Sequence, residues 1–314
     1  MMTVAFLFPG QGSQGVGMGQ ALAAASPAAA ATWAEADDAL GLPLSRLCFE
    51  GPEAELALTA NTQPALLTAS VATARALAER GVTPALAAGH SLGEYSALVV
   101  AGAIGFADGV RLVRRRGELM QEAVPVGHGA MAALLGIDLA GAEEACAEAA
   151  QGEVVAVANV NAPGQIVIAG HRGAVERAVR AAVVRGGKKS VLLPVSAPFH
   201  SPLMKPAADR LAAELERLAI APPAIPVARN VDGALVTTAE DVRAALLRQV
   251  ASPVRWTSCV ERLQREGATM YLEVGPGRVL SGLLRRTLDG ARAHPVEDPA
   301  SLDRAVAALG GAPA

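Results

Sequence analysis

Aromatic residues and cysteines are scarce in this chain of 314 residues. Phe, Trp and Tyr make up only 3% of the sequence, so the core has to be built mainly from Ala, Val and Leu. The three cysteines, Cys48, Cys146 and Cys259, are odd in number and far apart. This spacing excludes a zinc motif and a disulfide framework and is typical of a reducing compartment. We therefore expect a cytoplasmic protein.

A membrane-spanning run, a signal peptide and a surplus of basic residues are missing as well. The most apolar later stretch, residues 95–107, is too short to cross a bilayer. Residues 1–8 lack the basic segment that opens a signal peptide. The net charge of −3 gives no support for nucleic-acid binding. We expect a globular protein with no membrane and no nucleic-acid partner.

The most informative stretch of the sequence is the pattern Gly-x-Ser-x-Gly, formed by Gly89, Ser91 and Gly93. A serine in this pattern can sit on a sharp turn between a strand and a helix and act as a nucleophile. Residues 82–88 predict a short buried strand, and residues 94–101 predict a helix whose positive N-terminal end would face an oxyanion. The pattern alone is weak evidence, because it can arise by chance in a chain with 32 glycines. The predicted strand before it and the predicted helix after it favour a catalytic Ser91.

Strands alternate with helices along most of the chain, which predicts an α/β fold with a mostly parallel sheet. The expected strands include residues 3–8, 225–230 and 270–274, and the expected helices include residues 61–80, 108–122 and 239–250. The order changes at residues 127–195, where β-α-β-β-α-β elements predict a ferredoxin-like α+β subdomain. We expect it to be inserted into a large α/β domain made of residues 1–126 and 196–314.

Residues 10–15, Gly-Gln-Gly-Ser-Gln-Gly, follow the first strand and formally match the dinucleotide-binding fingerprint. Such a unit would continue with a second strand that ends in an acidic residue. Asp37 and Asp38 instead lie within a helical run. The segment is better explained as a turn, or as a loop whose backbone N–H groups face an active site.

A catalytic serine needs a base within hydrogen-bonding reach, and the chain offers five histidines. We expect His90 to face away from its neighbour Ser91. His200 follows a predicted strand, in a loop held by Pro198 and Pro202, so a fixed backbone could aim its ring. His200 is the preferred base, with the other histidines as alternatives.

An acidic third member of a catalytic triad is poorly supported. In the chain order of a hydrolase it would lie between the serine and the histidine, at the end of a strand. Asp108 and Asp138 both look like helix N-caps instead. The sequence therefore favours a Ser–His dyad oriented by a neutral group.

Seven blocks of the sequence, in order, resemble malonyl-CoA:acyl carrier protein transacylases, the acyltransferases of fatty-acid and polyketide biosynthesis. They are Phe-Pro-Gly-Gln-Gly-Ser-Gln at residues 8–14, Thr-Gln-Pro-Ala at 62–65, Gly-His-Ser-Leu-Gly-Glu at 89–94, Arg-Gly at 116–117, Asn-Ala-Pro-Gly-Gln at 161–165, Pro-Val-Ser-Ala-Pro-Phe-His-Ser at 194–201 and Glu-Val-Gly-Pro-Gly at 273–277. The resemblance implies a hydrolase-like α/β domain with a ferredoxin-like insert, in agreement with the elements above. It implies no bound cofactor or metal, because malonyl-CoA is a substrate.

The resemblance also implies roles for single residues. Ser91 would be the nucleophile and His200 the general base. Gln249 would support the histidine. The backbone N–H groups of Gln11 and Leu92 would be the donors of the oxyanion hole. Asn161 would line the cleft between the subdomains.

Arg116 resembles the arginine that pairs with the free carboxylate of malonate. A planar guanidinium can hold a carboxylate with two hydrogen bonds and reject uncharged acyl groups. Phe199 lies immediately before His200. In related polyketide acyltransferases, phenylalanine at this position accompanies specificity for malonyl, and serine accompanies specificity for methylmalonyl. The implied reaction is a ping-pong transfer through a malonyl-serine ester.

The implied partners are malonyl-CoA and an acidic acyl carrier protein, with a monomer as the default state. Exposed basic residues near the cleft would suit such a carrier; the candidates are Lys188, Lys189, Arg285 and Arg286. The main alternative is a serine esterase or thioesterase, which shares Gly-x-Ser-x-Gly but does not explain Arg116. The sequence does not distinguish a fatty-acid from a polyketide pathway.

Overall fold

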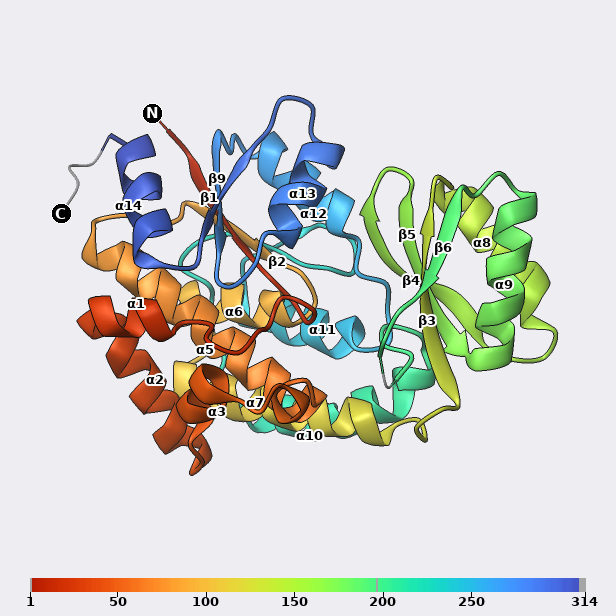
Figure 1. Ribbon diagram of the computed structural model, residues 1–314, viewed down its shortest axis with the longest axis horizontal. Coiled ribbons are helices and arrows are strands. Elements are labelled where there is room, and N and C mark those ends of the chain that lie inside the picture. The colour runs from red at the N-terminus through yellow and green to blue at the C-terminus, as the bar shows by residue number, and fades with distance from the viewer. Residues whose placement is uncertain (1, 196, 311–314) are drawn as a thin grey trace.

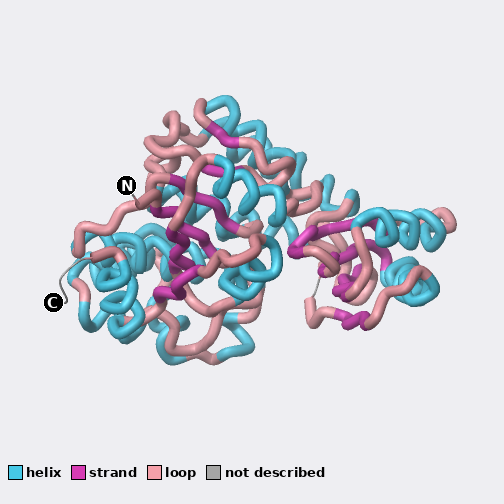
Figure 2. The backbone as a smooth tube through the Cα atoms, turned by 90° about the horizontal axis from the view of Figure 1, so that it is seen from above, coloured by secondary structure: helices cyan, strands magenta, loops and turns pink. Residues whose placement is uncertain are grey.

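Figure 1 shows the computed structural model of the chain, which describes residues 2–195 and 197–310. A large part is built from both ends of the chain, and a smaller part beside it is built from the middle (Figures 1 and 2). The expected boundary at residue 196 lies outside the described residues, as do residues 1 and 311–314. Within the described ranges, no helix combines the length and the apolar character needed to cross a membrane.

The large part is organised around a six-stranded sheet with the strand order β10-β9-β1-β2-β7-β8. Neighbouring strands pair in parallel except β7 and β8, which are antiparallel. The strands are β1 (Val4–Phe8), β2 (Leu86–Gly89), β7 (Val227–Ala228), β8 (Leu235–Val236), β9 (Met270–Val274) and β10 (Ala293–Val296). The prediction of a mostly parallel sheet is confirmed.

Helices cover both faces of this sheet. Consecutive residues of a strand point to opposite sides, so the apolar residues of β1 contribute to two cores, one on each face. Phe6 and Phe8 of β1 enter one core, and Ala5 and Leu7 enter another. The second core is closed by α12 (Trp256–Arg265) and α13 (Val279–Thr287). The first is closed by α1 (Gln20–Ala25), α2 (Pro27–Leu40), α3 (Leu44–Glu50), α4 (Glu53–Leu56), α5 (Thr59–Glu79), α6 (Leu92–Val100), α7 (Phe106–Glu122), α10 (Lys205–Arg217), α11 (Ala239–Gln249) and α14 (Pro299–Ala308).

The small part is a four-stranded antiparallel sheet with the order β4-β5-β3-β6. Its elements are β3 (Gly129–Leu135), α8 (Leu139–Ala150), β4 (Val155–Ala162), β5 (Gln165–His171), α9 (Arg172–Val184) and β6 (Lys189–Leu192). Both helices pack on one face of this sheet, away from the large part (Figure 1). The other face is turned toward the large part.

Several elements differ from the sequence expectation. β2 starts at Leu86 rather than residue 82, because Val82 completes the turn after α5 with a hydrogen bond to Leu77. β7 has only two residues, and α12 and β10 were not predicted. Asp138 caps α8 as expected, but Asp108 does not cap α7, which has Gly105 at that position.

Candidate active site

Ser91 lies on the turn between β2 and α6, at the carboxyl end of the sheet. Its backbone has φ 51° and ψ −103°, a conformation that costs a non-glycine residue on the order of 1–3 kcal/mol. The flanking glycines make this turn possible. A Cβ on Gly89 would lie 1.9 Å from the carbonyl group of Gly93, and one on Gly93 would lie 2.0 Å from the carbonyl oxygen of Phe8. The Gly-x-Ser-x-Gly pattern therefore reflects close backbone contacts, not chance.

Ser91 Oγ lies 2.7 Å from Nε2 of His200. Nδ1 of the same ring lies 3.0 Å from the backbone carbonyl oxygen of Gln249, which can only accept a hydrogen bond. The ring proton is therefore on Nδ1, and Nε2 is free to accept the proton of Ser91. Burial, together with the positive charge of Arg116, lowers the pKa of His200 to about 3, so the imidazole is neutral near pH 7. The structure thus places a Ser–His pair beside a neutral orienting group.

Three consecutive arginines on α7 differ in direction, because successive helical residues are about 100° apart. Arg114 and Arg115 are partly exposed and pair with Glu118 on the same helix. Arg116 is only 2% exposed and points to the active site. Helix α7 can approach the start of α5 closely because residue 117 is glycine. A Cβ at this position would lie 2.6 Å from the carbonyl oxygen of Thr59.

Neutral groups hold the guanidinium of Arg116. Nη1 donates a hydrogen bond to Gln63 Oε1 at 2.7 Å, and Nη2 donates to Gln249 Oε1 at 3.0 Å and to Ser91 Oγ at 3.2 Å. The group also lies 5.2 Å from the ring centre of Tyr95. Burial lowers the pKa of Arg116, but an arginine starts from so high a value that it stays charged. The cation is therefore available to an anionic group in the cavity.

A buried polar network lies behind Ser91. Oε2 of Glu94 accepts hydrogen bonds from Gln249 Nε2 at 2.7 Å and from the backbone N–H of Asn230 at 3.0 Å. Burial raises the pKa of Glu94 to about 7, although both hydrogen bonds act in the opposite direction. The resemblance to the family implied a role for Gln249 here, but no role was predicted for Gln63, Glu94 or Asn230. Their partners are distant in the sequence, so local spacing carries no signal for them.

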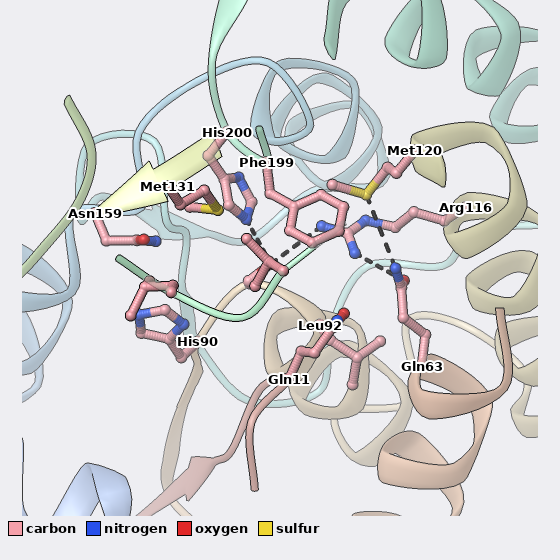
Figure 3. Close-up of a pocket in the computed structure, with 13 residues that line it drawn as sticks. Gln11, Gln63, His90, Leu92, Arg116, Met120, Met131, Asn159, Phe199 and His200 are labelled. Carbon is pink, nitrogen blue, oxygen red and sulfur yellow. Dashed lines mark hydrogen bonds between the residues drawn. The ribbon is translucent and has the colours of Figure 1, made fainter. Parts of the chain in front are cut away.

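Ser91 borders a cavity with a volume of about 120 Å³, and Figure 3 shows the residues that line it. Residues of both parts of the chain line it: Gln11, Gln63, His90, Ser91, Leu92, Arg116, Met120, Met131, Asn159, Leu193, Val195, Phe199 and His200. The volume and the buried cation of Arg116 suit a short acidic acyl group. The segment with Gln11, which formally matched a dinucleotide fingerprint, borders this cavity.

Asn161 and His90 meet at the boundary between the two parts of the chain. Asn161 was expected to line the cleft between the subdomains, and its Oδ1 lies 2.8 Å from His90 Nε2, so it links the small part to the large one. The residue of β4 that lines the cavity itself is Asn159. His90 also lines the cavity, but its Nε2 contacts Asn161, and the histidine at Ser91 Oγ is His200. The ring of His90 is fixed by the Asn161 contact and by Trp256, 5.7 Å away between ring centres.

The four basic residues predicted to face a carrier protein are all exposed: Lys188, Lys189, Arg285 and Arg286. The two lysines belong to the small part, at the start of β6, and the two arginines lie near the end of α13. Nη1 of Arg286 donates a hydrogen bond to Gln165 Oε1 at 2.6 Å, across the boundary between the parts.

The acyl transferase domain family matches residues 5–306 of the chain. The malonyl CoA-acyl carrier protein transacylase of Escherichia coli strain K12 is 52% identical over 307 residues, which cover 98% of this chain and 99% of that protein. The chain belongs to the malonyl-CoA:acyl carrier protein transacylase family. The expectation drawn from the seven sequence blocks is confirmed.

Solved structures of the family agree with this assignment. An acyl carrier protein S-malonyltransferase from Vibrio cholerae has a TM-score of 0.94 and 50% identity, covering 96% of this chain and 99% of that one. A malonyl-transacylase solved in complex with its type II polyketide synthase acyl carrier protein has a TM-score of 0.95 and 51% identity, covering 98% and 99%. The chain therefore shares the mixed α/β fold of these acyltransferases over almost its whole length.

Proposed function

We propose that this chain transfers a malonyl group from malonyl-CoA to the phosphopantetheine thiol of an acyl carrier protein. The observation that carries the proposal is the buried cation of Arg116, 3.2 Å from Ser91 Oγ. The guanidinium would bind the free carboxylate of the malonyl group while the thioester carbonyl lies at Ser91. The names of the Escherichia coli and Vibrio cholerae relatives support the same activity.

In the first half-reaction, His200 Nε2 takes the proton of Ser91 as Oγ attacks the thioester carbonyl. The tetrahedral oxyanion accepts hydrogen bonds from the backbone N–H groups of Gln11 and Leu92. Losing one such donor typically costs ~10²–10³ in rate. The carbon–sulfur bond then breaks, the imidazolium returns its proton to the sulfur, and CoA leaves as the thiol. A malonyl ester remains on Ser91.

In the second half-reaction, His200 takes the proton of the phosphopantetheine thiol, and the sulfur attacks the ester. The carbon–oxygen bond breaks, and the proton passes from the imidazolium to Ser91 Oγ. Arg116 holds the malonyl carboxylate through both halves and keeps the ester away from an orientation that water could attack. No bound cofactor or metal takes part in this scheme.

Phe199 accounts for a preference for unbranched malonyl. Its side chain is buried, lines the cavity and precedes the base His200. A ring at this position would crowd a methyl group on the α-carbon of the substrate. Phe199→Ser is therefore expected to raise the rate with methylmalonyl-CoA relative to malonyl-CoA, measured as the ratio of kcat/KM values.

The division of the chain follows the same proposal. Residues 1–126 and 196–314 would form the hydrolase-like domain, which the strand–turn–helix at Ser91 supports. Residues 127–195 would form a ferredoxin-like subdomain, which the antiparallel order β4-β5-β3-β6 supports. Three free, buried thiols fit a reducing cytoplasm, and we take the enzyme to be a monomer.

The experiment that tests the proposal is intact-mass analysis after brief mixing with malonyl-CoA. A malonyl adduct is expected on the wild type, none on Ser91→Ala, and little on Arg116→Ala. Hydrolysis of malonyl-CoA to free malonate without any adduct would favour the esterase or thioesterase alternative. Absence of both adduct and hydrolysis would overturn the proposal.

A further inference from the structure

The backbone around Ser91 needs restraint from outside the turn itself. A non-glycine residue at positive φ persists only where the surroundings hold it there. Ser91 precedes α6, so its N–H has no partner within the helix. The residues that border the cavity do not supply this partner.

Asn230 holds the turn on both sides of His90. Its Oδ1 accepts a hydrogen bond from the backbone N–H of Ser91 at 2.7 Å. Its Nδ2 donates to the backbone carbonyl of Gly89, also at 2.7 Å. One amide side chain therefore bridges the last residue of β2 and the nucleophile. On the far side of Ser91, Nε2 of Gln249 donates to the carbonyl oxygen of Ser91 at 2.9 Å.

Asn230 is itself fixed in place. It follows β7, the neighbour of β2 in the sheet, and is fully buried. Its backbone N–H donates to Glu94 Oε2 at 3.0 Å, and its carbonyl oxygen accepts from the N–H of Arg255 at 2.8 Å. The amide is thus carried by the sheet and by the start of α12. It is placed to act on Ser91 and not on the substrate, because it does not line the cavity.

We propose that Asn230 is a positioning residue for the nucleophile: it fixes the strained turn so that Ser91 Oγ stays within 2.7 Å of His200 Nε2. The inference rests on the proposed function for the identity of the acyl group, and on the geometry alone for the reactivity of Ser91. Without the Asn230 amide, the turn loses its tie to β7 and can relax. Both half-reactions use Ser91 Oγ and slow together, whereas binding of the malonyl carboxylate depends on Arg116 and is retained.

Two variants separate positioning from folding. Asn230→Ala removes both hydrogen bonds. Asn230→Asp keeps the shape and an oxygen that accepts from Ser91, but it loses the amide donor to Gly89 and brings a second carboxyl group beside Glu94. The matched control is Ser301→Ala in α14, because Ser301 is also a buried polar residue and completes a capping box outside the cavity lining. It is expected to lower the Tm without changing the reactivity of Ser91.

The measurement has two arms on each protein. One is the rate of Ser91 labelling by a fluorophosphonate probe, which needs no malonyl group. The other is single-turnover acylation by malonyl-CoA, followed by quenching and intact mass, which gives a maximal rate and a half-saturating concentration. Small misplacements of reacting groups cost on the order of 10²-fold. Asn230→Ala should slow labelling and acylation by about that factor, and Asn230→Asp by about tenfold, with half-saturating concentrations within about threefold of wild type.

Wild-type rates in either Asn230 variant would overturn the inference. So would a raised half-saturating concentration at an unchanged maximal rate, or an equal slowing in Ser301→Ala at a comparable loss of Tm. If Asn230→Ala does not fold, Asn230→Asp alone decides. If the wild type is labelled by the probe but gains no malonyl adduct, the proposed function fails, and the labelling rates still decide the role of Asn230.

Discussion

Arg116 donates a hydrogen bond from Nη2 to Ser91 Oγ across 3.2 Å, so the cation and the nucleophile occupy one site. The same nitrogen is also bound to Gln249. A carboxylate entering the cavity would compete for these N–H groups and draw them away from Ser91. The arrangement would therefore tie recognition of the acid group to release of the nucleophile.

Replacing Arg116 should separate acidic from uncharged acyl groups. Arg116→Ala is expected to lower the acylation rate with malonyl-CoA by on the order of 10²-fold, because a charge-assisted, two-point contact is lost. Arg116→Lys should recover only part of this rate, since an ammonium group lacks the planar fork. The control is Arg114→Ala, two residues away on the same helix, where the side chain is partly exposed. A malonyl preference over acetyl-CoA that survives in Arg116→Ala would contradict the assignment.

The pH dependence of acylation should lack the ionisation typical of a histidine. The folded protein lowers the pKa of His200 from 6.5 to about 3, so the base is already neutral at mildly acidic pH. We expect kcat/KM for malonyl-CoA to show no ionisation of His200 between about pH 5 and about pH 8. Glu94 behind Ser91, whose pKa burial raises to about 7, titrates within this range, so the profile is also measured on Glu94→Gln. A rise with a midpoint between these limits that persists in Glu94→Gln and is absent from the free substrate would show that His200 titrates normally.

The lowered pKa of His200 also makes the free energy of unfolding depend on pH. Below pH 6.5 the unfolded chain takes up a proton on His200 and the folded chain does not, so the free energy of unfolding falls as the pH drops toward 3. His200→Ala should make this fall shallower, measured by chemical denaturation across the range. An unchanged slope would mean that the ring takes up its proton over the same pH range in the folded and the unfolded chain.

Two substitutions at Gln249 should have different effects. Gln249→Ala leaves the backbone carbonyl that orients His200 but removes the side-chain contacts with Arg116 and Ser91. It should lower the maximal acylation rate. Gln249→Glu places a carboxylate against Arg116, which would compete with malonate and raise the half-saturating malonyl-CoA concentration by about tenfold or more. Equal half-saturating concentrations in the two variants would argue against an available cation.

Charge reversal at Lys188 and Lys189 should weaken only the interaction with the carrier protein. The double variant Lys188→Glu/Lys189→Glu is expected to raise KM for an acidic carrier about tenfold at low salt, with the effect shrinking as salt increases. Acylation by malonyl-CoA should not change. Lys205→Glu is the control, because this exposed lysine pairs with Asp209 on α10. If KM for the carrier is unaffected by the double variant, the two lysines are not part of the docking surface.

The sequence predicts those parts of the site that depend on local backbone geometry. The turn at Ser91 follows from the two glycines that flank it at fixed positions. Helix geometry indicates only that three consecutive arginines cannot share one direction, and the choice of Arg116 came from the resemblance to the family. The network of Gln63, Glu94 and Asn230 could not be predicted in this way. Asn230 precedes Val-Asp-Gly and looks like an ordinary turn residue, and its role appears only when β7 lies beside β2.

The fold was predicted best where elements are long and regular. The helix expected at residues 61–80 is α5, and the β-α-β-β-α-β order of residues 127–195 matches the observed elements. Short strands of the large sheet were predicted less well. β7 lies inside the strand expected at residues 225–230 but has only two residues. β10 contains His294 and Pro295, shows no apolar run and was not predicted.

The strand order of the large sheet determines when its strands can pair while the chain is synthesised on the ribosome. β1 is among the first segments to emerge, yet one of its two neighbours, β9, begins at Met270. The small part, by contrast, is one continuous segment whose four strands form a sheet of their own, and an isolated bridge between Asn159 and Val254 joins β4 to the large part. It can therefore reach its native pairing while β1 still lacks β9, because domains fold as units during synthesis. The nascent chain carries an open sheet edge at β1 until about nine-tenths of the protein has been made.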